Sequence, residues 1–167
     1  MPLHAAEALI DRAARMLAHI GAVCTLAMLA LICADVFART LLRSPLPGIN
    51  EVVSYWLMVG LVFLPLGVVS GNRLHIEVEM VSDMLPSRGR AILFHTGRAL
   101  SAALLALLVW AAVEPAVSAT RIRESTDATV FELPLWPVRW AVLAACAVAM
   151  LVELRLMLRP APAEAAP

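Results

Sequence analysis

Few residues of this chain have the types and spacing that chemistry needs. His75 and Glu79 lie four positions apart, as two metal ligands on one face of a helix would. A zincin-type site has a second histidine at that spacing, however, and no position in the sequence suggests a third ligand. No nucleophile paired with a base and no pair of carboxylates in one cleft is evident. We therefore predict no catalytic residue and no metal site, and expect that the protein is not an enzyme.

The histidines also disfavour a haem, which needs facing histidines at similar depth on two membrane helices. They occur at positions 4, 19, 75 and 95, outside the apolar stretches or at their ends. There is no glycine-rich phosphate loop, so we expect no cofactor. The formal net charge is zero, which gives no electrostatic reason to expect nucleic acid as a partner. A membrane redox subunit that binds haem or quinone stays open as a less favoured alternative.

The remaining candidates for functional residues are charged side chains at the ends of the apolar stretches. Asp35 and Arg39 are spaced i,i+4 with the acid first, which is the favourable order on a helix. Glu51 is in the first turn of a predicted helix, where the helix dipole favours an acid. One interpretation is a local ion pair plus a helix-start acid, which contributes little when exposed to water. The other is a polar cluster that fixes the first two helices to each other or to a partner helix.

A second group of charged residues follows the second apolar stretch. Arg73, His75 and Glu77 would be solvated in a simple loop, but Glu77 falls on the apolar arc of the helix predicted there. A carboxylate on an apolar face favours a cationic partner, so an interaction site is the preferred interpretation. The candidate subunit-interface or structural polar residues are thus Asp35, Arg39, Glu51, Arg73, His75 and Glu77.

The composition indicates that membrane helices position these residues. Of 167 residues, 62% are hydrophobic and 16% are charged, whereas about 25% are charged in soluble domains. From Val52 to Gly71 the only ionisable side chain is the phenol of Tyr55. About 20 such residues, at about 1.5 Å each, cross the ~30 Å hydrocarbon core of a bilayer. Membrane lipids are therefore expected partners. We predict an all-α integral membrane protein with four transmembrane helices, at about 16–37, 52–71, 91–113 and 134–157.

The predicted organisation has three parts. Residues 1–15 form an amphipathic helix on the membrane surface, 16–157 the four-helix domain, and 158–167 a disordered Pro/Ala tail. An upstream extension of the first span is the alternative for 1–15. The first apolar stretch is longer than the core of a signal peptide and is expected to remain as an anchor.

Three local features are also predicted. Asn50 would cap the second span, Pro65 would kink it, and residues 72–90 would hold a short interfacial helix that ends before Pro86.

The distribution of arginines predicts that both termini face the cytoplasm. The terminal side of a four-span path holds eight arginines and the other side five. Aromatic residues gather at the span ends opposite the termini, as expected for an interfacial belt. A charge at mid-bilayer costs at least about 2.5 kcal/mol, so Arg98 and Arg139 are expected near span ends with their side chains reaching outward to water.

At four short motifs, given below, the sequence resembles the small membrane subunit of tripartite ATP-independent periplasmic (TRAP) transporters, the DctQ-like family. The likeness covers about residues 16–157, and Leu74 and Glu77-Val-Glu79 depart from the family's usual pattern. The matching motifs are Asp35-x-x-x-Arg39, Pro47-Gly48-x-x-Glu51, Arg73-x-His75-Ile76 and Leu133-Pro134-Leu135-Trp136.

The resemblance implies a multi-pass protein of the bacterial inner membrane that is paired with a large, many-span TRAP membrane subunit. A periplasmic substrate-binding protein would capture an organic anion such as a carboxylate, and an ion gradient would drive its import without ATP. The small subunit would brace the scaffold of the large one. The sequence agrees with such a passive role, because no predicted span carries a mid-membrane charge for a substrate or ion relay. A tetraspan scaffold or assembly protein with no transport role is the main alternative.

Overall fold

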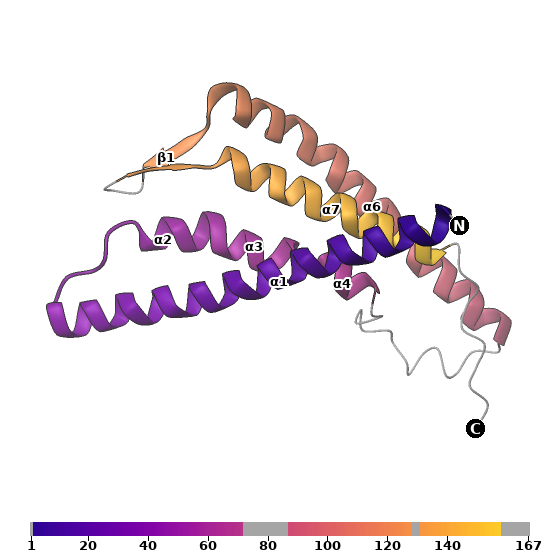
Figure 1. The fold of residues 1–167 in the computed structure, drawn as a ribbon, viewed down its shortest axis with the longest axis horizontal. Coiled ribbons are helices and arrows are strands. Elements are labelled where there is room, and N and C mark those ends of the chain that lie inside the picture. The colour runs from indigo at the N-terminus through magenta and orange to yellow at the C-terminus, as the bar shows by residue number, and fades with distance from the viewer. Residues whose placement is uncertain (1, 72–86, 128–130, 158–167) are drawn as a thin grey trace.

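The computed structural model describes residues 2–71, 87–127 and 131–157, and these form long helices and one small β-hairpin (Figure 1). The strands β1 (Ser125–Asp127) and β2 (Glu132–Pro134) are antiparallel, with Thr126 opposite Leu133. The helical elements are α1 (Pro2–Phe37), the π-helix η1 (Ala38–Leu42), α2 (Ile49–Val52), the π-helix η2 (Val53–Leu57), α3 (Met58–Phe63), α4 (Leu66–Gly71), α6 (Ser87–Ile122) and α7 (Trp136–Met157).

Four helical segments are long and apolar enough to cross a membrane, which confirms the predicted all-α, four-span fold. They are Glu7–Leu42, Ile49–Gly71, Phe94–Ile122 and Trp136–Met157. The second and fourth agree with the predicted spans within a few residues. The third continues past Pro115 to Ile122, because a proline in a membrane helix is tolerated where neighbouring groups satisfy the freed backbone.

The first helix has no break between the predicted surface segment and the first span. Helix α1 runs continuously from Pro2 to Phe37, which matches the alternative of an upstream extension. The predicted interfacial helix, which was to end before Pro86, and the predicted tail at 158–167 both lie outside the described residues.

The second span is interrupted, as Pro65 predicts. Helix α3 ends at Phe63 and α4 begins at Leu66, since Pro65 has no N–H for the helical ladder. The predicted Asn50 cap is wrong. Asn50 lies inside α2, and the N-cap is Gly48, whose φ of 83° is a left-handed conformation that glycine adopts without a steric penalty. The carbonyl of Gly48 accepts the first helical hydrogen bond, from the N–H of Val52 at 3.2 Å.

Helix α7 packs against helices of both halves of the chain. It contacts α6 along much of its length and also contacts α4, α3 and α1, whereas α1 packs mainly on α3, α4 and α7. The chain therefore forms two helix hairpins, α1 with α2–α4 and α6 with α7, which meet around α4 and α7 (Figure 1). Helix α1 begins and α7 ends at the same end of the molecule (Figure 1). At the other end, the Nε1–H of Trp56 in η2 donates to the carbonyl of Pro134 in β2 at 3.1 Å.

The helices approach closely through small residues. A Cβ atom at Gly60 would lie 2.9 Å from Sγ of Cys24, and one at Gly21 would lie 3.0 Å from Cγ of Pro65. Between α1 and the second span, glycine therefore leaves room for the facing helix, as is common where membrane helices pack by van der Waals contact. The fully buried side chains of α7 include Ala145, Cys146 and Ala149, which are also small.

The β-hairpin was not predicted. The connection from Ala116 was expected to begin as helix, and it does so up to Ile122. Arg123 then adopts a left-handed conformation with φ 48°, which ends the helix and turns the chain into β1.

Candidate functional site

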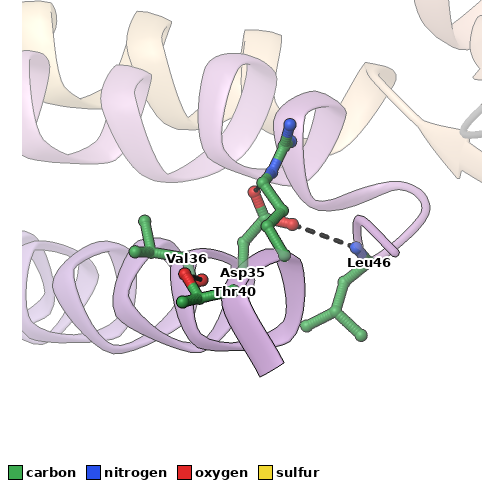
Figure 2. A network of polar contacts seen from close by, with 5 residues as sticks. Asp35, Val36, Thr40 and Leu46 are labelled. Carbon is green, nitrogen blue, oxygen red and sulfur yellow. Dashed lines mark hydrogen bonds and ion pairs between the residues drawn. The ribbon is translucent and has the colours of Figure 1, made fainter. Parts of the chain in front are cut away.

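Asp35 ties the end of the first span to the loop before the second. Its Oδ2 accepts a hydrogen bond from Nε of Arg39 at 2.7 Å. Its Oδ1 accepts one from the backbone N–H of Leu46 at 3.0 Å (Figure 2). The predicted i,i+4 pair is therefore present, with Asp35 buried and Arg39 about half exposed. Both oxygens of this carboxylate are used within the hairpin. The ion pair itself is local, and the bond to Leu46 adds a contact between the end of the first span and the turn before the second.

Glu51 does not join this cluster. It lies half-buried in the first turn of α2, and its carboxylate makes no hydrogen bond or ion pair with the part of the chain that the structure describes. The dipole of α2 favours an acid at this position. The other candidates, Arg73, His75 and Glu77, are within 72–86 and lie outside the described residues.

A buried ion pair that the sequence analysis missed joins three helices. Nη1 of Arg98 in α6 lies 2.7 Å from Oε2 of Glu153 in α7 and also donates to the carbonyl of Ser70 in α4 at 3.3 Å. The side chains of Arg98 and Glu153 are only 9% and 1% exposed. The guanidinium carbon is 5.3 Å from the ring centre of Phe94, within the range of a cation–π interaction.

The expectation that Arg98 reaches outward to water is therefore wrong. Its position near the end of a span is as expected, but its guanidinium turns inward because a carboxylate of a neighbouring helix lies at the same depth. A pattern in the sequence could have shown this pair. Arg98 is in the first turns of the third span, Glu153 is in the last turns of the fourth, and consecutive antiparallel spans bring these two levels together.

A second pair joins the first helix to the last. Nη1 of Arg155 in α7 lies 2.7 Å from Oδ1 of Asp11 in α1 and donates to the carbonyl of Glu7 at 3.3 Å. Asp11 lies in the segment 1–15 that was predicted as a helix on the membrane surface. Its contact with α7 shows instead that the beginning of α1 packs beside the end of the bundle.

At the opposite end, Arg139 lies near the start of α7 with 40% of its side chain exposed, as predicted, and it is also paired. Its Nε and Nη2 donate to the two carboxylate oxygens of Glu124, both at 2.7 Å, in a bidentate pair. Beside it, Nε1 of Trp140 donates to the hydroxyl of Thr120 at 2.7 Å. These contacts join the end of α6 to the beginning of α7.

The polar groups are thus arranged to hold helices to one another. Helix α7 is tied to α6 near both of its ends and to α1 near its C-terminal end. Within 2–71, 87–127 and 131–157, no group of three or more His, Cys, Asp or Glu residues is placed to hold a metal ion.

Comparison with known proteins identifies the family of this four-span unit. A family model described as the DctQ component of tripartite ATP-independent periplasmic transporters matches residues 28–162. The chain belongs to the DctQ family. It is therefore a multi-pass membrane component of TRAP type, from a family of transporter components rather than of enzymes, as the motifs predicted. No individually curated protein matched the chain.

The family match also bears on the alternatives. It covers most of the chain, including Glu124, Arg139 and the buried pair Arg98–Glu153. A family of transporter components is favoured over an unrelated tetraspan scaffold and over a membrane redox subunit.

Proposed function

We propose that this DctQ-family chain braces the large, many-span subunit of a TRAP transporter in a bacterial inner membrane, with both termini in the cytoplasm. The complex imports an organic anion such as a carboxylate, which a periplasmic substrate-binding protein captures, and an ion gradient drives the import. The observation that carries the bracing role is the buried pair of Arg98 and Glu153, which joins α6, α7 and α4.

A transport path would require ionisable groups that can exchange partners with a solute or an ion. Among the described residues, the charged side chains of Arg98 and Glu153 are the most deeply buried, and they are instead committed to each other across helices. A further pair at 2.7 Å joins Glu124 to Arg139. Breaking such a buried pair is costly, so the helices it joins move together. A unit of this kind is suited to holding a moving partner in place.

The outward face of α6 is our candidate for the surface that binds the large subunit. In the most apolar stretch of this span only 6% is buried within the chain, whereas the corresponding share for α7 is 28%. Leu100, Leu104, Leu107 and Trp110 are exposed along it. The exposed carboxylate of Glu114 follows on the same helix and makes no ion pair with the described residues.

A carboxylate on an apolar membrane face is costly unless a cation lies beside it. We propose that Glu114 faces a basic side chain of the large subunit, and that Glu51, which also makes no ion pair with the described residues, is a second contact. Asp35 and Arg39 would hold the hairpin turn that precedes Glu51, and Arg73, His75 and Glu77 remain proposed interface residues.

Co-purification tests this proposal. The tagged chain would be expressed with the large subunit, and the molar ratio of the two measured after extraction in mild detergent. E114Q and E51Q should each lower the recovered large subunit several-fold while the amount of the tagged chain is unchanged. E132Q is the matched control, because Glu132 is an exposed acid in β2 outside the spans. Wild-type ratios in both E114Q and E51Q would contradict the proposed surface.

A further inference from the structure

A small cavity lies where α6 ends and α7 begins, beside the β-hairpin. Its volume is about 270 Å³, and Thr120, Arg123 and Trp136 line it. Thr120 is in the last turns of α6, Arg123 follows the end of that helix, and Trp136 is the first residue of α7. The bracing role of the chain does not use this cavity.

Of the described residues that line the cavity, Arg123 and Trp136 offer hydrogen-bond donors that the other described residues leave unused. The nearest acid in sequence, Glu124, is paired through both oxygens with Arg139 at 2.7 Å, and among the described residues it makes no ion pair with Arg123. No other described acceptor bonds to the guanidinium of Arg123 or to the indole N–H of Trp136. The hydroxyl of Thr120 is already engaged, since it donates to the carbonyl of Ala116 at 2.8 Å and accepts from Trp140 at 2.7 Å.

An anionic acceptor would complete these donors. The planar guanidinium presents several N–H groups in a fork that matches the oxygens of a phosphate, and an indole N–H adds one more donor. The backbone of Arg123 holds φ at 48°, a conformation that non-glycine residues seldom adopt, and it places this cation after the last turn of α6.

The surroundings of the cavity indicate where that anion comes from. Trp136 and Trp140 are 41% and 42% exposed at the start of a membrane span, the level at which tryptophans mark the boundary between lipid and water. Val113 and Val117 are also exposed. They precede Thr120 by seven and three residues, so they lie on the same face of α6 as Thr120 and deeper in the span. A ligand here has a polar head at the cavity and an apolar part along α6.

We propose that this cavity binds the phosphate of a glycerophospholipid headgroup, with Arg123 and Trp136 as donors and the acyl chains along Val113 and Val117. The proposal does not depend on the transport role. It assigns the site to a lipid of the leaflet opposite the chain termini.

A lipid-titration experiment tests it. The full chain, purified in detergent micelles, is titrated with phosphatidylglycerol while its thermal unfolding is followed. The parallel arms are diacylglycerol, which has the acyl chains without the phosphate, and inorganic phosphate alone. Phosphatidylglycerol should raise the unfolding midpoint in a saturable way, and neither of the other two should do so.

The variants decide which residue is responsible. R123Q should weaken the apparent affinity for phosphatidylglycerol about tenfold or more. R43Q is the matched control and should bind as wild type, because Arg43 is also exposed and left-handed, with φ 53°, but lies at the other hairpin turn. If R123Q does not fold, W136F, which keeps a ring and loses the N–H, should weaken binding several-fold.

Three outcomes would overturn the proposal. They are an unchanged affinity in R123Q or W136F, an equal shift with diacylglycerol, which would mean acyl contact alone, and an equal shift with inorganic phosphate, which would mean an adventitious ion only.

Discussion

Glu153 in α7 and Arg98 in α6 form an ion pair at 2.7 Å in which both side chains are buried. The same guanidinium donates to the carbonyl of Ser70, so the pair also holds the end of α4. The junction of three helices thus depends on two charges that neutralise each other. A lone charge in this position would face apolar side chains and lipid instead.

Removing one partner of this pair should therefore destabilise the protein strongly. We expect E153Q, which keeps the shape of the side chain, to lower the free energy of unfolding by about 3–5 kcal/mol, because it leaves the guanidinium of Arg98 buried without a counter-charge. Thermal or denaturant unfolding in detergent measures the loss. E124Q is the control at the more exposed pair and should lose less. Replacing both partners, as in R98M with E153M, should recover part of the loss. Wild-type stability in E153Q would contradict a stabilising junction.

The close approach of α1 and α3 gives a second prediction. G60A should lower the free energy of unfolding by about 1–3 kcal/mol, because its Cβ would lie 2.9 Å from Sγ of Cys24, so that the Cys24 side chain or the two helices must shift. G97A is the matched control, since a Cβ at Gly97 has no heavy atom within 4 Å. Alanine there should be neutral or slightly stabilising, as alanine is the better helix former. An equal unfolding midpoint for the two variants would show that the helices do not depend on this contact.

The carboxylate of Asp35 should control the order of the first hairpin turn. D35A removes the acceptor of the Leu46 N–H as well as that of Arg39, so the Leu46 amide should exchange with solvent at least tenfold faster. R39A removes only the half-exposed partner, and the Leu46 amide should remain protected. Hydrogen–deuterium exchange measured over this loop distinguishes the two variants. Equal protection in D35A and the wild type would rule out this function of the carboxylate.

The polar residues of the first two spans should affect assembly rather than selectivity. We expect E51A or R39A to weaken co-purification with the large subunit more than it changes the preference among substrates. Competition between a dicarboxylate and a keto acid, measured in complexes of each variant, tests the second part. A wild-type yield of the complex with an altered preference would count against a purely supporting role.

The local features were the ones that could be predicted from the sequence. The absence of charge from Val52 to Gly71 indicated a span, Pro65 indicated the interruption, and the spacing of Asp35 and Arg39 indicated their pair. Each of these depends on residues that are close together in the chain. Hydropathy and helical spacing are sufficient to detect them.

The long-range relationships were not predicted, for physical reasons. Arg98 and Glu153 are 55 positions apart, so local spacing does not reveal their pairing, which shows only when the depths of the third and fourth spans are compared. The four spans are almost equally apolar, so their composition does not indicate that α7 is central. The cap at Gly48 was missed for a local reason. It depends on a backbone angle, whereas Asn50 has a side chain of the type that usually caps a helix.

Uptake by proteoliposomes tests the bracing role most directly. Vesicles that contain the wild-type complex, the E114Q complex, or this chain alone would receive the substrate-binding protein, an inward ion gradient and a labelled dicarboxylate or keto acid. We predict uptake by the wild-type complex, a reduced rate with unchanged preference in E114Q that follows the amount of large subunit retained, and none by the isolated chain. Transport by the chain alone would contradict the account.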